Sequence, residues 1–118
     1  MKVLVVEDSP SMRSYVVNII ESGSDDVEIV EAENGYEALK TLPHHKFDAI
    51  LTDINGLELV SFLKNHPVYK TIPIMVISTE STTEDRNRAA ALGAEEYLVK
   101  PFEAPELVAK LRKLLRVA

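Results

Sequence analysis

Residues 49–60, AILTDINGLELV, contain an apolar run, a carboxylate and the start of a second apolar pattern. Ala49–Thr52 has the composition of a short buried strand and leads directly into Asp53. The apolar residues within 59–63 then recur at spacings of three and four, which is the period of an amphipathic helix. Asn55-Gly56 between apolar runs is a strong β-hairpin signal, but the helical spacing that follows it favours a strand–turn–helix unit.

The same strand–helix alternation runs along the whole chain. The predicted strands are Val3–Val6, Val27–Ala32, Ala49–Thr52, Pro73–Ile77 and Tyr97–Val99. The predicted helix starts are Ser9-Pro10, Asn34, Gly56, Thr82 or Thr83, and Pro105. The apolar residues expected to face the core from the second and third helices are Tyr36, Leu39, Leu42, Leu59, Val60, Phe62 and Leu63. Apolar strands that alternate with helices imply a parallel sheet covered on both faces, so the sequence predicts a doubly wound α/β domain over residues 1–118.

Composition narrows the class of protein further. A chain of 118 residues is large enough for one domain with its own core. A net charge of −6 argues against a general nucleic-acid-binding surface, and the absence of cysteine excludes disulfides and thiolate metal sites. No apolar run approaches the roughly 18 residues of a membrane span, and the N-terminus turns acidic too early for a signal peptide. We therefore expect a cytoplasmic protein without membrane or direct nucleic-acid contacts.

Polar residues follow four of the predicted strands. Glu7-Asp8 follows the first strand, Asp53 the third, Ser78-Thr79 the fourth and Lys100-Pro101 the fifth. Parallel strands end at one edge of the sheet, where such folds place their functional groups. Two like charges about 4 Å apart repel by about 4 kcal/mol at an effective dielectric of 20, so these carboxylates must shift a pKa or hold a cation.

The residue types predict which cation and which chemistry. A few oxygen ligands suit Mg²⁺, which keeps several waters and accepts phosphate oxygens. A metal-bound carboxylate beside a lysine and a hydroxyl can receive a phosphoryl group, because the cations neutralise the oxygens of the transferred group. An aspartyl-nucleophile phosphatase would normally carry a second acid two residues after the nucleophile, where this chain has Asn55.

Four strings of the sequence resemble one known family. VLVVEDSPSMR, ILTDIN, IMVISTE and EEYLVKPF are similar, in this order, to the response-regulator receiver domain of two-component signalling. The resemblance spans essentially the whole chain. It implies the flavodoxin-like strand order 2-1-3-4-5 with helices on both faces.

The resemblance also implies roles for single residues. Asp53 corresponds to the phospho-acceptor, and Glu7 with Asp8 to the acidic pair that binds Mg²⁺. The backbone carbonyl of Asn55 corresponds to a further metal ligand. Lys100 corresponds to the lysine of the site and precedes a proline whose peptide bond is usually cis in the family.

Two further positions correspond to the family's switch. Ser78 matches the hydroxyl that follows the phosphoryl group, and Tyr97 an aromatic that changes rotamer. The implied donor is a phosphohistidine on a sensor histidine kinase or phosphotransfer protein. Such a domain is not an enzyme beyond Mg²⁺-dependent self-phosphorylation and autodephosphorylation. Its effector is not implied.

The turn after Asp53 departs from the family pattern. Receivers usually carry a methionine-proline-containing segment between the positions of Asn55 and Gly56. Three explanations are open: the sequence omits residues of the natural chain, the loop is short and the metal site distorted, or the chain extends and exchanges its second half with a partner. Strained short hinges favour exchange. The alternative function is therefore a phosphorylation-impaired pseudo-receiver or a domain-swapped homodimer in place of a monomer.

Overall fold

The sheet of this protein consists of five parallel strands. A computed structural model describes residues 1–23, 26–53 and 56–116. The strands are β1 (Lys2–Val6), β2 (Glu28–Ala32), β3 (Ala49–Asp53), β4 (Ile74–Ser78) and β5 (Glu96–Val99). Their order is β2-β1-β3-β4-β5, which confirms the predicted topology. Each predicted strand is present; the bounds differ by one residue at one end, and for β4 by one residue at both ends.

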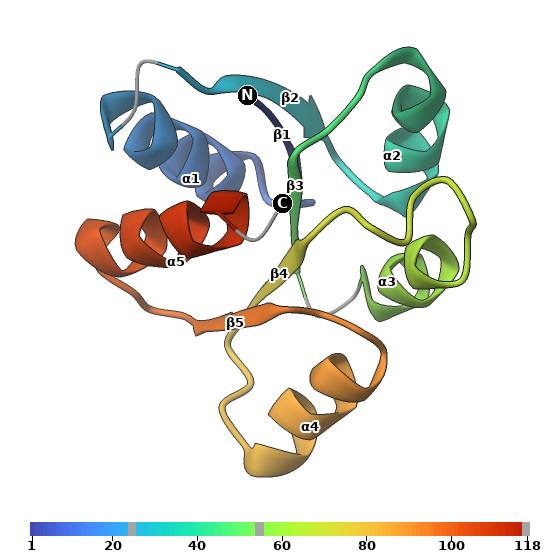
Figure 1. Cartoon of the computed structure of the whole chain (residues 1–118). Helices are drawn as coiled ribbons and strands as arrows, with labels where there is room; N and C mark the ends of the chain where they lie inside the picture. The colour runs from blue at the N-terminus through green and yellow to red at the C-terminus, as the bar shows by residue number, and fades with distance from the viewer. Residues whose placement is uncertain (24–25, 54–55, 117–118) are drawn as a thin grey trace.

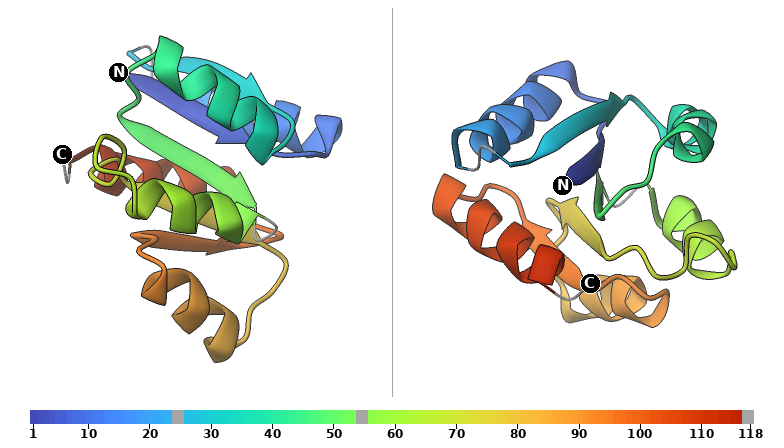
Figure 2. Two further views of the ribbon diagram at one scale, coloured as in Figure 1. Left: turned by 90° about the vertical axis from the view of Figure 1, so that its right-hand side faces the viewer. Right: turned by 45° about the horizontal axis from the view of Figure 1, so that its top comes forward.

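Helices cover both faces of this sheet (Figure 1). The helices are α1 (Pro10–Gly23), α2 (Gly35–Thr41), α3 (Leu57–Lys64), α4 (Thr83–Ala91) and α5 (Ala104–Arg116), with a short 3₁₀ turn at Leu42–His44. Helices α1 and α5 lie together on one face, and α2, α3 and α4 lie on the other, as the turned views also show (Figure 2). No helix among the described residues has the length and apolar character needed to cross a membrane.

Strand residues alternate between two hydrophobic clusters, one on each face. Val3 and Val5 pack with α1 and α5, whereas Leu4 and Val6 pack with α2, α3 and α4. This alternation follows from the two-residue period of a strand. Because both faces are covered, the central strands β1, β3 and β4 are largely apolar, whereas the edge strands β2 and β5 carry Glu28, Glu31 and Glu96.

Side-chain caps fix the start of three helices. The Ser9 hydroxyl accepts a hydrogen bond from the backbone N–H of Met12. Asn34 caps α2 by accepting from the backbone of Glu37, and Thr82 caps α4. Such caps satisfy amide groups that have no partner within the helix. The predicted caps are confirmed, and Thr82 rather than Thr83 caps the fourth helix.

The predicted inner faces of α2 and α3 are wrong at three positions. Tyr36, Leu39 and Phe62 are 68%, 39% and 46% exposed. In the short α2, Ala38 is on the buried side, four residues before the buried Leu42 of the 3₁₀ turn, so Tyr36 and Leu39 fall on other sides of the helix. In α3, the core takes Leu59, Val60 and Leu63. These three exposed side chains line one groove between α2 and α3.

Candidate functional site

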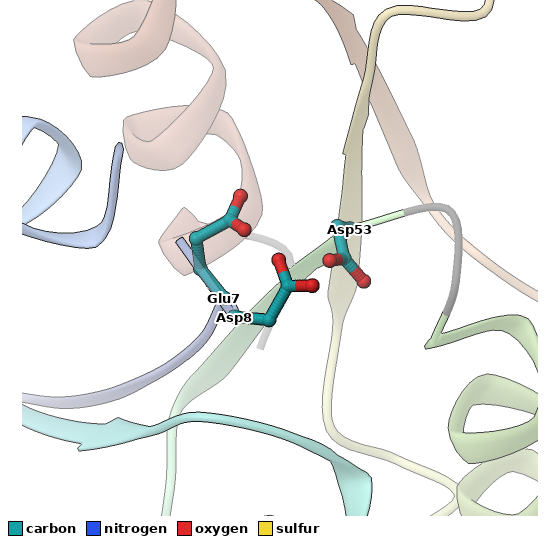
Figure 3. Close-up of side chains that lie close together, drawn as sticks. All are labelled: Glu7, Asp8 and Asp53. Atoms are coloured by element: carbon teal, nitrogen blue, oxygen red, sulfur yellow. The ribbon is translucent and has the colours of Figure 1, made fainter. Parts of the chain in front are cut away.

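Three carboxylates meet at the carboxyl end of the sheet. Glu7 and Asp8 follow β1, and Asp53 is the last residue of β3. One oxygen of each lies within 4.8 Å of the others. Figure 3 shows Glu7 and Asp8 projecting from one backbone segment and Asp53 from the neighbouring strand. The predicted convergence of these three residues is therefore present in the structure.

A lysine from the far edge of the sheet joins this cluster. Lys100 follows β5, and its Nζ lies 2.9 Å from Oε1 of Glu7. The side chains of Lys100 and Glu7 are 17% and 7% exposed. The Lys100–Pro101 peptide bond is cis, as the resemblance implies. The second Glu7 oxygen accepts a hydrogen bond from the backbone N–H of Ser9, so both carboxylate oxygens of Glu7 have partners.

The electrostatics of the cluster centre on Asp53. Burial raises the pKa of this carboxyl above its ordinary value, and the charges of Glu7 and Asp8 raise it further. Lys100 and a backbone hydrogen bond from Gly56 lower the pKa in part. The excess of negative charge is thus only partly balanced by the described residues around Asp53.

The donor set of the cluster fits a magnesium ion. Glu7, Asp8 and Asp53 offer carboxylate oxygens, which are the hard ligands that Mg²⁺ prefers. Few protein ligands suffice, because Mg²⁺ keeps several waters. Val6, Glu33, Asn34 and Gly35 line a cavity of about 120 Å³ together with Asp8, Asp53 and Gly56. The predicted Asn55 carbonyl ligand lies outside the described residues.

The raised pKa of Asp53 gives a pH-dependent prediction. The pKa of this carboxyl in the folded protein exceeds its unfolded value of about 3.9. The fold therefore loses stability as pH rises from the unfolded pKa to the folded pKa, and the loss stays constant at higher pH. Asp53→Asn removes this charge. We therefore expect the variant to be more stable than the wild type at pH 7 in EDTA.

Urea unfolding at pH 7 and at pH 3 measures this difference. The two proteins should have similar free energies of unfolding at pH 3, where the carboxyl is protonated in both states. Added Mg²⁺ should stabilise the wild type more than the variant. A wild type that is equally stable or more stable at pH 7 without metal would contradict this account.

Ser78, the last residue of β4, and Tyr97, within β5, are linked through Glu80. The buried Ser78 accepts a hydrogen bond from the Glu80 N–H, 2.9 Å from its Oγ. The Tyr97 hydroxyl donates to the Glu80 carbonyl at 2.7 Å. In the β3–β4 register Asp53 is opposite Ile77, so Ser78 lies one residue beyond it on the adjacent strand. Ser78 and Tyr97 thus contact two sides of one loop residue, which the sequence did not predict.

The acids and the lysine belong to the same chain. Segment exchange would have joined Glu7, Asp8 and Asp53 of one chain to Ser78 and Lys100 of another. Instead, Lys100 contacts Glu7 within one chain. Glu7, Asp8, Asp53 and Lys100 therefore meet without exchange of a segment, and neither the swapped dimer nor the pseudo-receiver is supported.

Fold and site together define an α/β protein with a cluster of acidic side chains, whose oxygens fit a cation, at the carboxyl edge of a parallel sheet. The family model described as "Response regulator receiver domain" matches residues 3–112. The chain belongs to the response regulator receiver domain family.

Curated relatives support the same family. A probable transcriptional regulatory protein of Picosynechococcus sp. is 36% identical over 127 residues, covering 98% of this chain and 49% of that protein. The transcriptional regulatory protein CusR of Escherichia coli is 34% identical, covering 98% of this chain and 52% of CusR. The chain therefore spans about half the length of these relatives. The first alignment is longer than the 118 residues of the chain, so that relative carries residues without a counterpart here.

Solved structures share the fold over nearly the whole chain. Chemotaxis protein CheY4 of Vibrio cholerae is 34% identical, with a TM-score of 0.88 and coverage of 97% of this chain and 98% of that one. The signal receiver domain of a histidine kinase from Syntrophus aciditrophicus is 28% identical, with a TM-score of 0.88 and coverage of 99% and 91%. Both similarities agree with the topology and with the family.

Proposed function

We propose that this protein is a receiver that takes a phosphoryl group onto Asp53 from a phosphohistidine of a sensor histidine kinase or phosphotransfer protein. The observation that carries the proposal is the cluster of Glu7, Asp8 and Asp53, whose oxygens lie within 4.8 Å of one another. Lys100 reaches the same cluster through Glu7. Residues 1–118 would act as one cytoplasmic domain, and membership of the family supports this partner class.

The chemistry requires a nucleophile and neutralisation of the transferred charge. A carboxylate oxygen of Asp53 would attack phosphorus. The new O–P bond forms as the P–N bond breaks, and the imidazole nitrogen keeps the electron pair. Mg²⁺, when bound by Glu7, Asp8 and Asp53, supplies positive charge to the phosphoryl oxygens. Lys100 would add a second positive charge, and the Ser78 hydroxyl a hydrogen bond.

The proposed response to phosphorylation is a structural change at one surface of the domain. A phosphoryl group on Asp53 adds negative charge and acceptor oxygens. If the Ser78 hydroxyl turns toward that group, it loses its hydrogen bond from the Glu80 N–H. The carbonyl of the same Glu80 accepts a hydrogen bond from the Tyr97 hydroxyl. We therefore propose that phosphorylation moves the β4–α4 loop and alters the face formed by α4, β5 and α5. The effector that binds this face is not specified by the proposal.

Phosphoryl capture from a small donor tests the proposal. Purified protein with acetyl phosphate and Mg²⁺ should gain the mass of one phosphoryl group, and EDTA should prevent the gain. Asp53→Asn should abolish it, because an amide cannot form the acyl phosphate. Asp26→Asn, the same change at an exposed aspartate that precedes β2 at the amino end of the sheet, is the matched control and should label normally. Labelling that persists in Asp53→Asn would overturn the assignment of the acceptor.

A further inference from the structure

Arg13, in the first turn of α1, contacts the backbone of the acidic pair. Its Nη1 donates to the backbone carbonyl of Glu7 at 2.7 Å, and its Nε donates to Oε1 of Glu31 at 3.0 Å. The Arg13 side chain is only 15% exposed. One guanidinium therefore connects the start of α1 with the carboxyl ends of β1 and β2.

The carbonyl that Arg13 holds belongs to the peptide that joins Glu7 to Asp8. A peptide group is planar, so fixing the direction of its carbonyl also fixes the N–H and Cα of the next residue. The Glu7 N–H is itself bonded to the Ala32 carbonyl at 3.0 Å. These two hydrogen bonds hold the backbone on both sides of Glu7. The direction in which Asp8 projects depends on the bond from Arg13 to the Glu7 carbonyl.

The two acids differ in how their side chains are held. Glu7 is buried, and its carboxylate contacts Lys100 and the backbone of Ser9. Asp8 is exposed. The position of the Asp8 carboxylate is thus set mainly by its backbone. A group that fixes this backbone acts on metal binding without touching the metal.

We propose that Arg13 is a positioning residue of the acidic site, which orients Asp8 toward the cation by holding the Glu7 carbonyl. This inference rests on the proposed function, since it concerns the Mg²⁺ that Glu7, Asp8 and Asp53 would bind. Partners that orient metal ligands typically change metal affinity by about 10- to 100-fold when removed. Because the Glu31 side chain is 48% exposed, the Arg13–Glu31 ion pair contributes little to stability by itself.

The test must separate the effect of Arg13 on local charge from its effect on the position of Asp8. Removal of Arg13 alone leaves the Glu31 carboxylate unpaired, and this extra negative charge attracts Mg²⁺. The double variant Arg13→Met with Glu31→Gln removes both members of the pair and leaves the net charge unchanged. Glu31→Gln alone keeps the bond from Arg13 to the Glu7 carbonyl. Arg13→Lys keeps the charge and one donor group.

Isothermal titration with Mg²⁺ measures the affinity directly, without phosphoryl transfer. We expect the Kd of the double variant to rise by about 10-fold or more. Glu31→Gln and Arg13→Lys should each stay much nearer the wild type. Thermal midpoints in EDTA should remain similar, because the lost pair is partly exposed. A double variant with wild-type Kd would overturn the inference.

A second variant keeps the test decisive if the double variant does not fold. Arg13→Gln leaves Glu31 charged, so electrostatics alone should tighten Mg²⁺ binding. A weaker affinity in Arg13→Gln would support positioning, and a tighter or equal one would refute it. If the wild type itself does not bind Mg²⁺, the proposed function fails together with this inference. If the wild type binds and the variants bind equally, only the inference fails.

Discussion

Gly56→Ala is expected to lower the free energy of unfolding by about 3 kcal/mol, the upper part of the usual range for overpacking. A Cβ at Gly56 would overlap Oγ1 of Thr52. Thr52 is 1% exposed and belongs to β3, so its side chain has little space to move. β-Branched residues are also stiff about χ1. Urea unfolding of the wild type and the variant measures the loss.

Two changes at Thr52 test whether the collision is the cause. Thr52→Ala removes Oγ1. The nearest remaining atom of residue 52 is then its Cβ, 3.3 Å from the Cβ added at position 56. Thr52→Val keeps a branched side chain and serves as the matched control. In the alanine background Gly56→Ala should cost much less, by a coupling of about 1 kcal/mol or more. In the valine background the cost should persist. Equal costs in the two backgrounds would contradict the steric explanation.

Lys100→Met is expected to slow phosphoryl capture from acetyl phosphate by about 100-fold or more, the usual effect of losing one preorganised donor to a developing charge. The expectation follows from the proposed role of Lys100 beside the acidic cluster. Mg²⁺ affinity should not fall, since removal of a positive charge leaves the carboxylates more attractive to a cation. The initial rate of mass gain at saturating Mg²⁺ and the Mg²⁺ Kd are the two measurements.

A matched lysine separates this effect from a general change of charge. Lys113 is bonded to Glu96 at the surface, and its side chain is 71% exposed. Lys113→Met changes net charge by the same amount and should capture the phosphoryl group at the wild-type rate. Lys100→Met also leaves the buried Glu7 without its partner, so we expect a stability loss that Glu7→Gln partly restores. A labelling rate in Lys100→Met equal to that in Lys113→Met would remove Lys100 from the mechanism.

The sequence could predict the acidic site because the parallel topology itself brings the residues together. Apolar strands that alternate with helices must end at a common edge. Acids at the carboxyl ends of β1 and β3, and a lysine after β5, could therefore be expected to meet. The resemblance added the strand order and the cis bond before Pro101. Both are present in the structure.

The contacts that the sequence did not reveal involve the backbone. Arg13 bonds to the carbonyl of Glu7, and Tyr97 to the carbonyl of Glu80. A carbonyl is present at every position, so no residue pattern marks the one that is used. Arg13 lies in the first turn of a helix, where the simplest expectation for an arginine is a solvent-facing side chain. The sequence therefore did not indicate its contact with Glu7.

Periodicity also failed where a helix is short. α2 spans only Gly35–Thr41, and several choices of inner face fit so few residues. The structure selects Ala38, which is small enough to pack closely on the sheet, and leaves Tyr36 outside. Helix propensity and spacing hold no information on this choice, because it depends on the distance between the helix and the strands.

The contact between Glu7 and Lys100 joins residues 93 positions apart. During translation Glu7 is synthesised long before the lysine that pairs with it. An incomplete polypeptide would carry Asp53, the proposed nucleophile, without the positive charge of Lys100. On the proposed function, phosphoryl capture would therefore reach its full rate only after β5 has paired with β4, and chains that end before Lys100 would capture slowly.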